Sequence, residues 1–148
     1  MGYDTFRTGT AIDGTSPSPA KIHGAIDGGK KRGFLASFDL SKANVDKVAG
    51  TTNVCFKKPK GHVVRRFSVV SSVSLTTSQL AFGISGTPAK YGAAKAYGTT
   101  ANAEVVWHVA TAEDDLDADA ETIIMTASVA DLPAAGIVNV EMETLAVA

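Results

Sequence analysis

Alternation of apolar and polar residues is clearest between Val63 and Leu75. The odd-numbered positions are mostly apolar, Phe67 and Val69 among them, and the even-numbered positions are mostly polar. A period of two is typical of a strand that buries one face. The pattern predicts a long antiparallel strand with its odd positions, Val63 included, on the core face.

Other segments of the same kind follow along the chain. Glu104 to Ala110 alternates with Trp107 on its apolar side, and Ile137 to Leu145 alternates around Val140. Short apolar runs between turn residues predict further strands at residues 34–38, 51–57, 81–84 and 122–126.

Two segments lack a strand pattern. Ser41 is suited to cap a single helical turn that Gly50 stops, and Ala89 to Tyr97 predicts a short helix or a compact loop. Six to eight short strands with turns between them therefore predict an all-β fold, an antiparallel β-sandwich or a jelly-roll-like domain.

The first 33 residues differ in composition from the rest. They hold seven glycines and two prolines, and their large apolar residues are isolated. This composition continues neither a helix nor a central strand. We therefore predict an extended N-terminal arm at residues 1–33, followed by one β-sandwich domain at residues 34–148.

Charge is divided between the two halves of the chain. Residues 1–74 carry +7 and residues 75–148 carry −8, which together give the net charge of −1. Such a split indicates contacts with charged partners or neighbouring copies. We interpret two clusters as intersubunit or exposed charge features: the turn with Lys57, Lys58 and Lys60, and the acidic loop 113–121 with Asp114, Asp115, Asp117 and Asp119.

Motifs for catalysis and cofactors are incomplete. Gly24 to Lys30 matches a phosphate-binding loop, but Lys31 replaces the Ser or Thr that would hold Mg²⁺. The three histidines are far apart, and there is no G-x-S-x-G elbow. The acidic loop lacks the glycine of an EF-hand, although Ca²⁺ binding there stays open. We expect no enzyme activity, no cofactor and no metal.

Three other features favour an ordinary globular role. Cys55 is the only cysteine and is expected to be a small buried residue. No apolar run is long enough for a membrane span, and residues 1–4 do not open a secretory signal. Without an apolar span we expect no membrane as partner. The basic run Lys30–Arg32 has no interleaved aromatics, so we expect no specific nucleic acid, and an acidic protein surface is the better candidate partner for it.

Several turn motifs follow one another in a distinctive order along the chain. Lys58-Pro59-Lys60-Gly61 leads into the long strand, Phe82-Gly83-Ile84-Ser85-Gly86 follows, and Leu132-Pro133-Ala134-Ala135-Gly136 precedes the last strand. Over roughly residues 34–148 this order resembles small virion proteins of tailed bacteriophages, of the capsid decoration (cement) type.

The resemblance implies a structural protein on the capsid surface of the virion, made in the host cytoplasm. It implies a homotrimer that binds the major capsid protein and stabilises the shell by non-covalent bridging. Its expected capsid contacts lie in the arm: Tyr3, Phe6, Ile12, Lys30, Lys31 and Arg32.

Two alternatives remain at this point. One is another virion component, such as a tail tube, a head–tail connector or a fibre base. The other is a carbohydrate-binding adsorption module, which would need exposed aromatic residues such as Tyr91, Tyr97 and Trp107.

Overall fold

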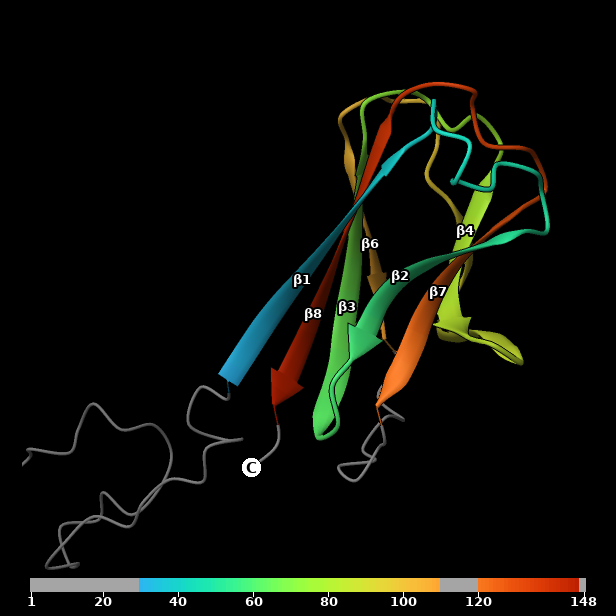
Figure 1. Cartoon of the computed structure of the whole chain (residues 1–148). Coiled ribbons are helices and arrows are strands. Elements are labelled where there is room, and N and C mark those ends of the chain that lie inside the picture. The colour runs from blue at the N-terminus through green and yellow to red at the C-terminus, as the bar shows by residue number, and fades with distance from the viewer. Residues whose placement is uncertain (1–29, 110–119, 147–148) are drawn as a thin grey trace, which may run out of the picture.

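In the part of the chain that the structure describes, eight antiparallel strands form two four-stranded sheets that face each other (Figure 1). The computed structural model describes residues 30–109 and 120–146. Within these ranges no helix is long and apolar enough to span a membrane. The strands are β1 (Lys30–Asp39), β2 (Thr52–Lys58), β3 (His62–Ser71), β4 (Gln79–Ile84), β5 (Thr87–Ala96), β6 (Glu104–His108), β7 (Glu121–Ser128) and β8 (Ile137–Ala146).

The strand order is that of a jelly roll. One sheet has the order β1-β8-β3-β6 and the other β2-β7-β4-β5. The first strand therefore pairs with the last, the second with the seventh, the third with the sixth and the fourth with the fifth. This nested pairing is a long hairpin rolled into two sheets. The all-β prediction is confirmed, and its jelly-roll form is the one observed.

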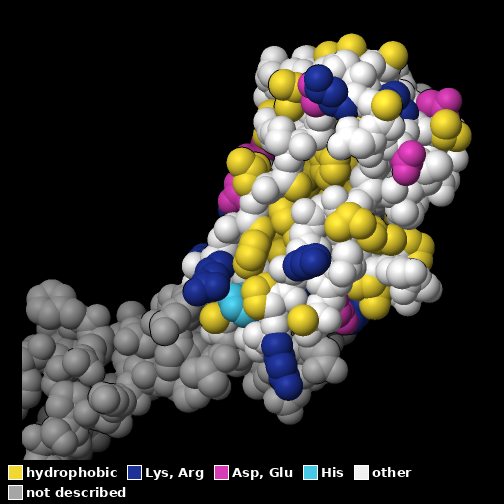
Figure 2. All heavy atoms as spheres, viewed as in Figure 1, with side chains coloured by type: hydrophobic (Ala, Val, Ile, Leu, Met, Phe, Trp, Pro, Cys, Tyr) yellow, Lys and Arg dark blue, Asp and Glu magenta, His cyan; other side chains and the backbone are white. Residues whose placement is uncertain are grey.

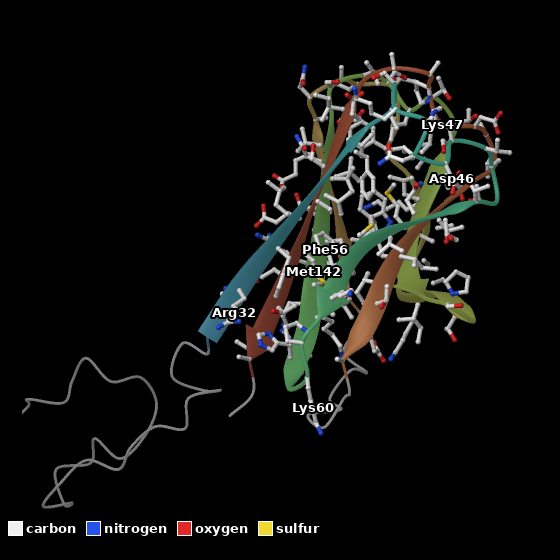
Figure 3. All side chains as sticks on the ribbon, viewed as in Figure 1. Arg32, Asp46, Lys47, Phe56, Lys60 and Met142 are labelled. Carbon is white, nitrogen blue, oxygen red and sulfur yellow. The ribbon has the colours of Figure 1, made fainter. Side chains whose placement is uncertain are left out.

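Aromatic side chains fill the space between the sheets. Phe67 of β3 and Phe82 of β4 stack across the core with ring centroids 4.5 Å apart. Trp107 meets Phe82 edge-on and donates its indole N–H to the Leu80 carbonyl at 3.1 Å. Figure 3 places Phe56 in the same interior. Trp107 is thus a core residue, as its alternating strand predicts.

The prediction for residues 89–97 is wrong, because most of this segment belongs to strand β5. Its alanines favour a helix locally, but pairing with β4 determines the conformation. The predicted helical turn after Ser41 is also absent, and the described chain there forms turns and bends. Gly50 does end this segment, with a φ of 92° that favours glycine.

A β-bulge changes which residues of β3 face the core. Val64 pairs with Thr144 and Arg66 with Glu143, so Arg65 is an extra residue on β3. An extra residue reverses the alternation on either side of it. Val64 therefore joins the core cluster, whereas Val63, predicted on the core face, does not.

The first strand begins earlier than the sequence indicates. Residues Lys30–Gly33, which we assigned to the arm, pair with the last four residues of β8. The remainder of the predicted arm, residues 1–29, and residues 110–119 of the acidic loop lie outside the described residues.

Candidate interaction surface

One end of the sandwich gathers basic side chains, and we call it the basic end. It is the end where β1 begins, where the turns β2–β3 and β4–β5 lie, and where β8 finishes. Figure 3 shows Arg32 and Lys60 there. Residues 1–29 and 110–119 also connect to the described chain at this end, through Lys30, Val109 and Ala120. The basic residues that define it are Lys31, Arg32, Lys57, Lys58, Lys60, Arg66 and Lys90.

Glu121 is the acidic centre of the basic end. Its carboxylate lies 2.7 Å from Lys90 Nζ and 3.7 Å from Lys58 Nζ, and it accepts a hydrogen bond from the Tyr91 hydroxyl. These neighbours outweigh burial and hold the pKa of Glu121 below its usual value. Both lysines also approach the Tyr91 ring, with Lys90 Nζ 5.0 Å and Lys58 Nζ 5.9 Å from its centroid.

His62 is a second buried group at this end. Its Nδ1 is hydrogen-bonded to Thr144 Oγ1 at 2.9 Å, and the side chain is buried. Burial, with the positive charges of Arg32 and Lys58 nearby, lowers the pKa of His62. The ring is therefore held neutral among cations, which suits a structural role at this position.

Ion pairs on the outer face of the sheet are more exposed. Glu143 lies 3.3 Å from Arg66 Nε and 3.7 Å from Lys31 Nζ. The Lys31 side chain is 72% exposed. Surface pairs of this kind contribute little stability, so both basic side chains are able to exchange Glu143 for another acidic partner.

A groove opens between the edges of β1 and β2. Figure 2 shows hydrophobic side chains along the hollow between these strands, with basic side chains below it. Its volume is about 600 Å³, and its walls carry both apolar and charged residues, including Phe38, Val45, Val54, Asp46 and Lys42. The groove lies toward the opposite end of the sandwich, where β1 ends and β2 begins, so it is separate from the basic end.

The predicted site residues divide into three groups. Lys31, Arg32, Lys57 and Lys60 are exposed at the basic end, and Lys30 is the first residue of β1. Lys58 differs from the exposed position expected for this turn, because only 1% of its side chain is accessible and it pairs with Glu121 of the same chain. The others lie outside the described residues: Tyr3, Phe6, Ile12, Asp114, Asp115, Asp117 and Asp119.

The aromatic residues that would bind carbohydrate lie in the core, and the one cysteine that could act as a reactive thiol packs against it. Tyr91, Tyr97 and Trp107, the aromatics that a carbohydrate-binding surface would need, are all buried. Burial raises the pKa of the Cys55 thiol to about 12. In the ranges 30–109 and 120–146, no three or more His, Cys, Asp or Glu side chains are grouped so that they could hold a metal ion.

Sequence reasoning missed the central position of Glu121. It is the last residue of a segment rich in acidic residues, and nothing in the local pattern separates it from the others. The one sequence signal for its role is that Glu121 directly precedes the β-branched residues at 122–124 and so begins a strand.

Comparisons with known proteins identify a shared fold. No protein-family model matches the sequence, and no curated protein matches it. A chain of the cyanophage Pam1 capsid asymmetric unit superposes with a TM-score of 0.55 and 17% identity, over 90% of this chain and 95% of that one. A chain of the acidic stable capsid of Helicobacter pylori bacteriophage KHP30 gives a TM-score of 0.39 and 11% identity, over 78% and 91%. The second likeness is too weak to carry an argument, and the first establishes that the two chains share a fold.

Proposed function

We propose that this protein is a bacteriophage capsid decoration protein, which binds the major capsid shell and stabilises it without catalysis. The observation that carries the proposal is the fold shared with a chain of a phage capsid over nearly the whole length of both. The order of motifs that resembles virion proteins gives the same assignment independently.

The arrangement of the chain supports such a role. Residues 1–29 lead directly into β1 at the basic end, so the arm and the basic side chains can meet one partner together. Contacts made by linked segments add through effective concentration, which suits a protein that bridges several shell subunits. An acidic surface on the shell would be the complementary partner for Lys31, Lys57 and Lys60.

Cosedimentation with shells tests the proposal. Shells assembled from the major capsid protein of the same virus should carry the full-length chain to the pellet. A variant lacking residues 1–29 should stay in the supernatant with its melting temperature unchanged, because the truncation ends before β1. A full-length chain that does not sediment, and that is missing from purified particles, would overturn the assignment.

Charge reversal tests the basic end separately from the arm. We expect the double variant Lys57→Glu/Lys60→Glu to weaken shell binding, with an effect that shrinks as salt is added. The matched control is Lys42→Glu, an exposed lysine in the β1–β2 connection at the opposite end. Equal binding by both variants would remove the basic end from the capsid contact.

Copy number and oligomeric state complete the proposal. A decoration protein covers the shell in many copies, whereas a tail-tube, connector or fibre-base protein is present in far fewer. Quantitative mass spectrometry of purified particles separates these cases. We further propose a homotrimer, and light scattering on the free protein measures this directly.

A further inference from the structure

Three of the four edge strands within residues 30–109 and 120–146 carry features that disfavour pairing with another chain. In β2, Val54 pairs with Ile124 and Phe56 with Ile123, so Cys55 forms a bulge. The pairing of β5 shifts register twice, and this strand also contains Pro88. The third of these edge strands, β6, has only five residues. Bulges, prolines and short length are the usual protections of a sheet edge.

The edge strand β1 has none of these protections in its centre. It is ten residues long, contains no proline, and pairs with β8 in one unbroken register. The segment 33–38 is uncharged, and Leu35 within it is 72% exposed. A long, regular and partly apolar edge is a template for another strand. Among the described residues, β8 is the only strand hydrogen-bonded to it.

We propose that β1 pairs antiparallel with β1 of a second copy, around a two-fold axis that passes beside Leu35. In this register Leu35 lies opposite the partner's Leu35, and Lys31 lies opposite the partner's Asp39. Gly33 then lies opposite the partner's Ser37. The two four-stranded sheets join into one continuous sheet of eight strands.

The sequence of β1 is self-complementary in this register. Lys31, Leu35 and Asp39 are all odd-numbered, so they share the outer face of the sheet, while Phe38 points into the core. Opposite charges at the two ends and a leucine in the middle suit an isologous contact, because Leu35 at the axis meets its own copy and the contact of Lys31 with Asp39 occurs twice. Asp39 keeps its charge, since hydrogen bonds from Ser41 lower its pKa.

This pairing is independent of the capsid assignment. Two paired strands bury less surface than the roughly 1,200 Å² of a stable interface, so we expect this contact to be weak and reversible in solution, whether it joins two single chains or two of the homotrimers proposed above. If the protein decorates a shell as proposed, neighbouring copies held close together would pair far more completely.

Disulfide trapping of purified protein tests the pairing without any shell. Facing residues of antiparallel strands have Cα atoms about 4.5–5.5 Å apart, within the range of a disulfide. We expect Leu35→Cys to form a covalent dimer under mild oxidation, and the half-buried native Cys55 should not compete, because burial raises the pKa of its thiol to about 12. The matched controls are Val54→Cys and Val129→Cys, which replace residues 62% and 69% exposed at other places.

Charge exchange tests the register. In the Leu35→Cys background, Lys31→Asp or Asp39→Lys should lower the initial dimer yield about fivefold, and the double exchange should restore it. Circular dichroism checks the fold, because Asp39 also binds Ser41.

Two results would overturn the proposal. One is a Leu35→Cys dimer yield no higher than that of the two control variants. The other is a yield that rises when residues 1–29 are deleted, which would mean that the leading segment of the chain covers the edge. Shell binding that fails while the cysteine dimer forms would reject the capsid assignment and leave the pairing of β1 in place.

Discussion

Lys58 and Glu121 form an ion pair between the end of β2 and the start of β7, with Lys58 Nζ 3.7 Å from Glu121 Oε2. The Lys58 side chain is 1% exposed, whereas that of Glu121 is 19% exposed. The pair joins the neighbouring strands β2 and β7 at the basic end of their sheet. A buried ammonium group needs this carboxylate, so the contact controls the stability of the basic end.

Glu121→Gln should destabilise the protein by about 3 kcal/mol, because it leaves the Lys58 charge buried without its carboxylate. The amide keeps the size of the side chain and its hydrogen bond to the Tyr91 hydroxyl. The free energy of unfolding in urea measures the effect.

Two further variants serve as controls for this prediction. Glu143→Gln removes a carboxylate whose partners are exposed, so its cost should stay below about 1 kcal/mol. Lys58→Met combined with Glu121→Gln should recover much of the lost stability, because no buried charge is left. Equal losses for Glu121→Gln and Glu143→Gln would contradict the buried ion pair.

Stability should fall as the pH drops below about 6.5, the ordinary pKa of histidine, because His62 has a lower pKa in the folded protein. Between the folded and unfolded pKa values the unfolded chain binds more protons, so the free energy of unfolding rises with pH. The loss is complete once the pH is below the folded pKa. Glu121, whose pKa is lowered from 4.5, adds a second loss that begins below that value.

His62→Gln separates these two contributions. Glutamine can still bond Thr144 and does not titrate, so the loss just below pH 6.5 should disappear while the loss at lower pH persists. Thermal unfolding followed from pH 8 to pH 3 measures both. A variant with the unchanged pH profile of the wild type would show that another group is responsible.

Gly83→Ala should be far more damaging than Gly50→Ala. A Cβ at Gly83 would clash with the Thr87 carbonyl oxygen and lie 2.5 Å from the Pro88 carbonyl carbon, so the backbone at the start of β5 would have to move. Gly50 has a positive φ but nothing within 4 Å of that position, so alanine there should cost only about 1–2 kcal/mol. Melting temperatures of the two variants provide the comparison, and equal shifts would contradict the close approach at Gly83.

The native Cys55 thiol should not react with Ellman's reagent at pH 8, because burial raises its pKa to about 12. Unfolding in guanidinium should release one thiol per chain, since Cys55 is the only cysteine. Rapid labelling of the folded protein would mean that the β2 bulge opens readily, which the hydrogen-exchange rates of β2 would then reveal.

The sequence pattern predicted the strands well where alternation was regular. Val138, Val140 and Met142 were expected on one face of the last strand, and all three are fully buried. The helix or loop expected over residues 89–97 was wrong because alanine favours a helix locally, whereas β4 supplies a hydrogen-bonding partner directly across the two-residue turn at 85–86. A two-residue turn with a glycine is a hairpin signal, and it outweighs the helix preference of the alanines that follow it.

Bulges and buried charges were also beyond sequence reasoning. Arg65 has no neighbour that marks it as an extra residue, yet it decides whether Val63 or Val64 joins the core. Lys58 ends β2 beside a turn rich in lysine, where exposure is the ordinary expectation. Its burial follows from Glu121 and Tyr91, which only the fold brings to it.

The pairing of Lys30 with Ala146 makes the order of strands almost circular. Because these residues face each other on antiparallel neighbours, a hairpin turn of a few residues would be enough to link them. A circular permutant built this way could open at the exposed Thr76–Thr77 turn and keep every strand pairing. Residues 1–29, which precede β1 at the basic end, could then be attached at the new N-terminus, at the opposite end of the sandwich.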